Sequence, residues 1–76
     1  MINPWIEVSP TRWHCSINSA RVGHAYQIDC VLVESTIHYL LFHFNDEKSK
    51  GKCVVVVGSL DEAKNAANQH FVLGRV

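Results

Sequence analysis

One segment of this sequence has the periodicity of an amphipathic helix, and it lies near the C-terminal end. Ser59-Leu60-Asp61-Glu62 has the form of a capping box, in which the Ser59 hydroxyl accepts from the Glu62 amide and the Glu62 side chain reaches back to the Ser59 amide. Small or apolar residues then recur at helical spacing: Leu60, Ala63, Ala67 and His70 or Phe71. Gly74 is placed to end the segment. The sequence therefore predicts one helix with a narrow apolar stripe.

The segments before this helix have the composition and alternation of β-strands. Residues 5–8, 12–17, 25–33, 37–44 and 53–57 are rich in β-branched and aromatic side chains, and turn or loop segments separate them at 9–11, 18–24, 34–36 and 45–52. A chain of 76 residues makes one domain. We therefore predict an α+β fold for residues 1–76, with an antiparallel meander sheet of four to five strands and one C-terminal helix packed on one face.

A single helix covers only one face of such a sheet, so the second face needs its own explanation. If Trp13, Cys30, Phe42 and Val55 lie under the helix, strict alternation turns five aliphatic residues the other way: Val31, Val33, Leu41, Val54 and Val56. Exposed, they would form a larger apolar patch than a monomer usually carries. We expect this patch to bind a protein partner or a second copy of the chain, with a homodimer as the expected form. The alternative is that the N-terminal strand and residues 18–24 fold across it.

Charge and cysteine content narrow the class of protein. Seven basic and seven acidic residues balance, and the isoelectric point is near 6.9, which is not typical of a polycation that binds nucleic acid or of an acidic mimic. Cys15, Cys30 and Cys53 are an odd number without short spacing, which favours free thiols in a reducing cytosol. The first residues lack the features of a signal peptide, and no apolar stretch approaches the roughly 20 residues of a membrane span. We expect a cytoplasmic protein with no membrane partner.

No arrangement of residues indicates catalysis, a metal or a cofactor. Paired ligands such as Cys-x2-Cys are missing, and His38 and His43, five apart on one strand, point to opposite faces. The cysteines share strand faces with apolar neighbours, the pattern of core thiols rather than of nucleophiles. His70 on the helix stripe is interpreted as a residue at the edge of the core. We expect no catalytic residue, no metal and no cofactor, and a small enzyme is the least favoured class of function.

A nucleic-acid-binding module is the alternative that the charged loop suggests. Three lysines close together could contact phosphates, and two side chains of the preceding strand could stack on bases: Lys48, Lys50, Lys52, Tyr39 and His43. Asp46 and Glu47 precede these lysines and cancel much of their field. The loop is therefore interpreted first as a solvated hairpin tip.

Two segments resemble a loose group of very small phage and prophage proteins. They are WIEVSPTRW at residues 5–13 and GSLDEAKNAANQH at residues 58–70, about 22 of the 76 residues, while the middle of the chain has longer and more apolar strands than that group. The shared motifs are a pair of tryptophans and a capped helix, so the resemblance implies a scaffold and a phage or prophage origin rather than site residues. Some proteins of this build are anti-CRISPR proteins that bind an interference complex. The resemblance thus implies a host cytoplasm and a role against bacterial defence.

Together these observations predict a non-enzymatic protein-binding module. A phage-encoded inhibitor of a bacterial defence complex, similar to anti-CRISPR proteins, is the form that the resemblance implies. The nucleic-acid-binding module stays as the alternative, and a small enzyme as the second alternative.

Overall fold

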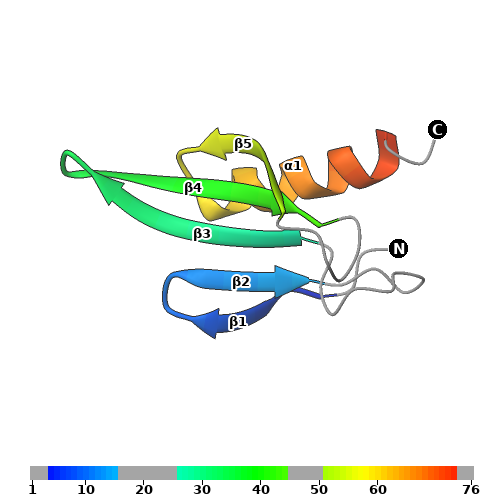
Figure 1. The fold of residues 1–76 in the computed structure, drawn as a ribbon, viewed down its shortest axis with the longest axis horizontal. Coiled ribbons are helices and arrows are strands. Elements are labelled where there is room, and N and C mark those ends of the chain that lie inside the picture. Colours follow the sequence, from blue (N-terminus) through cyan, green and yellow to red (C-terminus); the bar gives the residue numbers. More distant parts are fainter. Residues whose placement is uncertain (1–3, 16–25, 45–50, 74–76) are drawn as a thin grey trace.

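A computed structural model describes residues 4–15, 26–44 and 51–73. Five strands and one helix follow one another along the chain: β1 (Ile6–Ser9), β2 (Arg12–Cys15), β3 (Tyr26–Val33), β4 (Thr36–His43), β5 (Lys52–Val57) and α1 (Leu60–Leu73). The strands pair with their sequence neighbours in the order β1-β2-β3-β4-β5, and every pair is antiparallel (Figure 1). The predicted α+β meander with one C-terminal helix is confirmed. Gly74 and residues 16, 17 and 25 of the predicted strands lie outside the described residues.

Strand register arranges the side chains beneath the helix in rows that cross the sheet, and we call this side the helix face. The first row is Cys15, Tyr26, His43 and Lys52; the second is Trp13, Ile28, Leu41 and Val55; the third is Cys30, Tyr39 and Val57; the fourth is Leu32 and Ile37. Cys15, Tyr26, Ile28 and Leu41 are at most 1% exposed. The first two rows therefore form the centre of the core.

Helix α1 packs on the helix face over β3, β4 and β5 through its smallest side chains. Ala63 and Ala67 are fully buried, as the apolar stripe predicts, and small residues let a helix lie close to a sheet. Leu60 and Phe71 pack at the two ends of the same stripe. Trp5 and Trp13 are half-buried and pack against the core as well.

The helix begins with a cap that differs in one bond from the predicted capping box. Ser59 Oγ accepts from the Glu62 N–H at 3.2 Å, as expected. The Glu62 carboxylate, however, accepts from the Gly58 N–H at 3.3 Å, one residue earlier than predicted. Both bonds join the end of β5 to the first turn of α1, so the two elements are held together across a connection of two residues.

A β-bulge in β5 overturns part of the predicted alternation. Leu41 pairs with Val55 and Phe42 pairs with Cys53, so Val54 is an extra residue without a pairing partner on β4. A bulge places two successive side chains toward one side, and Val54 and Val55 both pack against the core. The prediction that Val54 faces away from the helix is therefore wrong, and Cys53 rather than Val54 lies on the second face.

The prediction that Leu41 faces away from the helix and Phe42 lies under it is also wrong. Leu41 is fully buried on the helix face, whereas Phe42 lies on the opposite side, which we call the open face. Strand β4 is apolar on both sides, so its own alternation does not identify the side that the helix covers. Pairing with β3 decides the matter, because Leu41 is the neighbour of buried Ile28.

The end of the β3–β4 hairpin projects beyond the rest of the sheet (Figure 1). Within the described residues, β2 pairs with β3 only as far as Asp29, and β5 pairs with β4 only from Tyr39. Residues 31–38 therefore form a two-stranded hairpin arm. Its aliphatic side chains are exposed on both faces: Val31 37%, Leu32 70%, Val33 51% and Ile37 52%.

The turn of this hairpin arm consists of Glu34 and Ser35, both of which have positive φ, at 50° and 66°. Positive φ at both central residues is the requirement of a type I′ turn, for which Asn-Gly is preferred. Residues with a Cβ other than Asn or Asp rarely adopt this conformation. The pairing of β3 with β4 continues without interruption up to Val33 and Thr36, and this holds the turn in that conformation.

Replacing Glu34-Ser35 with Asn-Gly is expected to raise the free energy of unfolding by about 1 kcal/mol, because the new residues adopt positive φ with less strain. Urea denaturation of the wild type and of the double variant measures the change. The matched control replaces both residues with Ala, which removes the same side chains without favouring positive φ. Equal stability of the Asn-Gly variant and the wild type would contradict the turn assignment.

Candidate functional site

Three ring side chains from three elements meet at the end of the sheet opposite the hairpin arm. Tyr26 and His43 are neighbours in the first row, and the last turn of α1 brings His70 onto them. The Tyr26 hydroxyl and His70 Nδ1 are hydrogen-bonded at 2.9 Å. The His43 and His70 ring centroids are 4.7 Å apart, and those of Tyr26 and His43 are 5.0 Å apart. We call these three residues the imidazole cluster.

Burial controls the protonation of the imidazole cluster. Burial, with the charge of Cys15 as a second cause, raises the pKa of Tyr26 to about 12, so the phenol stays neutral. A neutral phenol can donate to a neutral His70 or accept from a protonated one, so the bond between them is compatible with both states. Burial also lowers the pKa of His43, and the nearby His70 lowers it further. The cluster therefore resists holding two positive charges.

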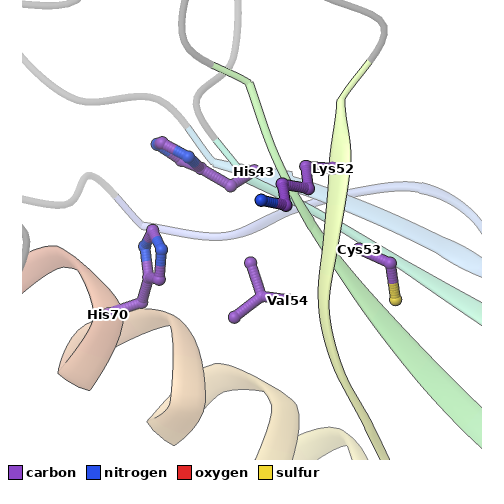
Figure 2. Close-up of a pocket in the computed structure, with 5 residues that line it drawn as sticks. All are labelled: His43, Lys52, Cys53, Val54 and His70. Atoms are coloured by element: carbon purple, nitrogen blue, oxygen red, sulfur yellow. The ribbon is translucent and has the colours of Figure 1, made fainter.

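A pocket of about 250 Å³ opens beside the cluster (Figure 2). It is lined by His43, Lys52, Cys53, Val54 and His70. The bulge places Val54 between β5 and α1, where it forms the apolar wall, while the Cys53 sulfur points away from the imidazoles. Lys52 is exposed and pairs with His43, so its side chain lies on the same face as the two imidazoles. The pocket thus combines one ammonium and two imidazoles.

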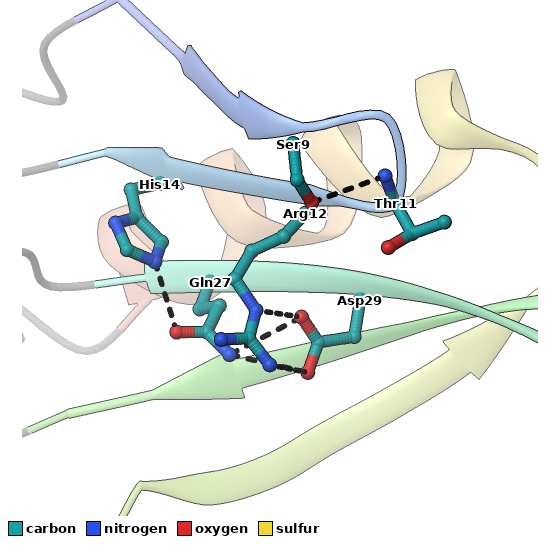
Figure 3. Close-up of polar contacts among 6 residues, drawn as sticks. All are labelled: Ser9, Thr11, Arg12, His14, Gln27 and Asp29. Atoms are coloured by element: carbon teal, nitrogen blue, oxygen red, sulfur yellow. Dashed lines mark hydrogen bonds and ion pairs between the residues drawn. The ribbon is translucent and has the colours of Figure 1, made fainter.

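Polar side chains on the open face form a chain across β2 and β3 (Figure 3). His14 Nε2 donates to Gln27 Oε1 at 3.0 Å, since an amide oxygen can only accept. Gln27 Nε2 donates to both carboxylate oxygens of Asp29, and Arg12 Nε donates to the same carboxylate at 2.8 Å. Half of the Arg12 side chain is exposed, so the ion pair adds little stability. These groups satisfy one another and make this half of the open face polar.

The structure places the residues of the predicted partner surface on two different faces of the sheet. Val31, Val33 and Val56 are exposed on the open face, as predicted, whereas Leu41 and Val54 belong to the helix face. The remaining exposed aliphatic residues of the hairpin arm, Leu32 and Ile37, were not among the predicted surface residues. One feature of the sequence could have indicated their exposure. Both lie close to the turn, in the part of the two strands that extends farthest from the start of the helix.

Of the residues predicted for nucleic-acid contact, the structure brings His43 and Lys52 together, whereas Tyr39 lies two rows away on the same face. Tyr39 lies on the helix face, with its ring centroid 6.1 Å from that of Trp13. His43 belongs to the imidazole cluster, and Lys52 lines the pocket beside it. Lys48 and Lys50 lie outside the described residues. A platform of Tyr39 and His43 for base stacking would have to form on the face that carries α1.

No group of three or more His, Cys, Asp or Glu side chains that could hold a metal ion occurs among residues 4–15, 26–44 and 51–73. Over the same residues, α1 is too short and too polar to cross a membrane.

Comparisons with protein-family models, curated proteins and solved structures give no match. The function of this chain is therefore inferred from its own geometry.

The stability of the protein is expected to decrease as the pH falls. Because the pKa of His43 is lower in the folded chain than its ordinary value of about 6.5, the unfolded chain binds more protons there. The free energy of unfolding should therefore decrease as the pH falls from about 7 to below the pKa of folded His43. Urea denaturation at several pH values measures this, and His43→Gln should lose less stability than the wild type. His38→Gln, on the open face, is the control and should lose as much stability at low pH as the wild type. The hypothesis is wrong if His43→Gln also loses as much stability as the wild type.

Two of the three free thiols, Cys15 and Cys53, are expected to react at very different rates. Cys15 is buried, and burial raises its pKa to about 12, which leaves a thiolate fraction of only about one in ten thousand at pH 8. Cys53 is exposed on the open face. With an aromatic disulfide reagent, Cys53→Ser should remove the fast phase and Cys15→Ser should leave it unchanged. Loss of the fast phase in Cys15→Ser would show that the first row opens to solvent.

Proposed function

We propose that this chain is a non-enzymatic protein-binding module whose contact surface is the hairpin arm. The supporting observation is the exposure of Val31, Leu32, Val33 and Ile37 on a two-stranded segment that neither α1 nor the flanking strands cover. Isolated aliphatic residues on a surface need no explanation, but four on one projecting element are typical of an interaction site.

The energetics favour a partner at this position. Covering an aliphatic side chain stabilises a complex by roughly 1.5–3 kcal/mol, so four of them contribute several kcal/mol before the costs of association. A two-stranded hairpin alone is only marginally stable in water. Order in the hairpin arm would therefore increase on binding.

The strand edges of the hairpin arm indicate how a partner binds. Among the described residues, residues 31–33 of β3 and 36–38 of β4 have no strand pairing on their outer sides. An extended segment of a partner can add to such an edge through main-chain hydrogen bonds, and its alternate side chains can cover the apolar ones. The proposed partner is therefore a protein with an accessible extended, apolar segment.

The resemblance to small phage proteins directs the search for this partner. We propose that the chain inhibits a bacterial defence complex by occupying an extended segment of one of its subunits. This part of the proposal is supported by the tryptophan pair and the capped helix, and by no residue of the hairpin arm. A second copy of the chain is the other partner to be tested, since its own hairpin arm has the same strand edges.

Leu32→Lys and Ile37→Lys are expected to reduce partner binding at least tenfold, because each places a charge in an apolar contact. Binding is measured with the wild type and the variants as baits for purified bacterial defence complexes. Val72→Lys is the matched control: it introduces the same charge at an aliphatic residue that is 63% exposed on α1. All three sites are exposed, so the free energy of unfolding should change by no more than about 0.5 kcal/mol.

Light scattering of the same proteins shows whether the partner is a second copy. A wild-type mass of twice 8.6 kDa, returning to 8.6 kDa in Leu32→Lys, assigns the hairpin arm to a homodimer. A monomer that binds a defence subunit and loses it in both arm variants supports the inhibitor. Equal binding by the wild type and the arm variants would contradict the proposed surface.

A further inference from the structure

We propose that the pocket lined by His43, Lys52 and His70 binds a dianionic oxyanion, namely phosphate or a phosphate monoester. The site lies at the end of the sheet opposite the hairpin arm, so it is independent of the proposed protein contact. It depends on the meeting of three nitrogen-bearing side chains that are far apart in the sequence.

Register and the helix bring these side chains together. His43 and Lys52 are paired residues of β4 and β5, so both point to the helix face, and His70 reaches the same place from the last turn of α1 (Figure 2). The Lys52 ammonium and the two imidazoles supply N–H donors from three elements, and charge-assisted bonds from such donors are the strong ones for an oxyanion. Behind the lining, Tyr26 holds His70 in place through the hydrogen bond of 2.9 Å between its hydroxyl and His70 Nδ1.

The charge of the lining selects an anion. Among the described residues, none of the five that line the pocket is acidic, whereas Lys52 supplies an ammonium group. Among the described residues, the groups that face His43 are Tyr26 from β3, Lys52 from β5 and His70 from α1. A bound dianion would stabilise a proton on His43, which burial and His70 disfavour in the free protein.

The size and polarity of the pocket agree with a small polar ligand. A volume of about 250 Å³ corresponds to roughly eight waters at about 30 Å³ each, which is room for an oxyanion and a short organic group. Among the described lining residues only Val54 is aliphatic, so an apolar ligand would gain little there. A metal cation is disfavoured by the ammonium of Lys52, and within the described part of the chain the two imidazoles have no third ligand beside them that would complete a metal site.

Nuclear magnetic resonance with inorganic sulfate and inorganic phosphate tests the proposal at constant ionic strength, maintained with sodium chloride. Sulfate stays a dianion from pH 5 to pH 8, so any pH dependence of its binding arises from a change of protonation in the protein. The His43 and His70 ring signals should shift with saturation. The dissociation constant for sulfate should fall at least threefold from pH 7.5 to pH 5.5, and the pKa of His43 should rise in saturating sulfate. Phosphate should saturate the same signals, and acetate, a monoanion, should bind more weakly.

Lys52→Met is expected to weaken sulfate binding about tenfold or more, because it removes a charge-assisted hydrogen bond. Lys64→Met, on α1 and outside the pocket lining, removes the same net charge and should bind sulfate as the wild type does. His43→Asn should abolish the pH dependence. Shifts that rise linearly without saturation, or equal losses in Lys52→Met and Lys64→Met, would overturn the site.

The same variants separate this proposal from the protein-binding function. Leu32→Lys should leave the sulfate dissociation constant unchanged, and Lys52→Met should leave capture of a protein partner unchanged. Loss of sulfate binding in the arm variant would overturn the independence of the two sites.

Discussion

The short connection between β5 and α1 determines how the helix lies on the sheet. Only Gly58 and Ser59 separate the two elements, and the cap bonds hold this connection in place. The helix must therefore start at the third row and run back antiparallel to β5. Its 14 residues span about 21 Å, so it passes the first row and continues beyond it. Val72 and Leu73 are consequently exposed at one end, and the hairpin arm is left uncovered at the other.

This offset produces both candidate sites. At the far end of the helix, the last full turn brings His70 over the first row and creates the imidazole cluster with its pocket. Toward the other end, β3 and β4 continue past the start of the helix, and their fourth row stays in solvent. A longer connection would let the helix slide along the sheet, cover Leu32 and Ile37, and move His70 away from Tyr26.

Local signals in the sequence were sufficient for the fold, because each element carries its own. The capping box and the alanine stripe locate the helix, and the alternating apolar runs locate the strands. Three features could not be predicted locally. Strand β4 is apolar on both sides, so pairing with β3 decides that Leu41 is buried. Nothing in a run of four valines marks the residue that forms a bulge. The imidazole cluster joins Tyr26 and His70, 44 residues apart, and depends on both the register and the helix offset.

The bulge also makes one place in the chain tolerant of a change in length. Val54 is the extra residue between two regular pairs, Leu41 with Val55 and Phe42 with Cys53. Deleting one valine from the run would let both pairs form without the bulge and leave Lys52 and Cys53 on their present faces. A deletion elsewhere in the sheet would turn every following side chain of that strand over. Single-codon losses in this repetitive stretch are therefore compatible with the fold, whereas the same event in β4 would destroy it.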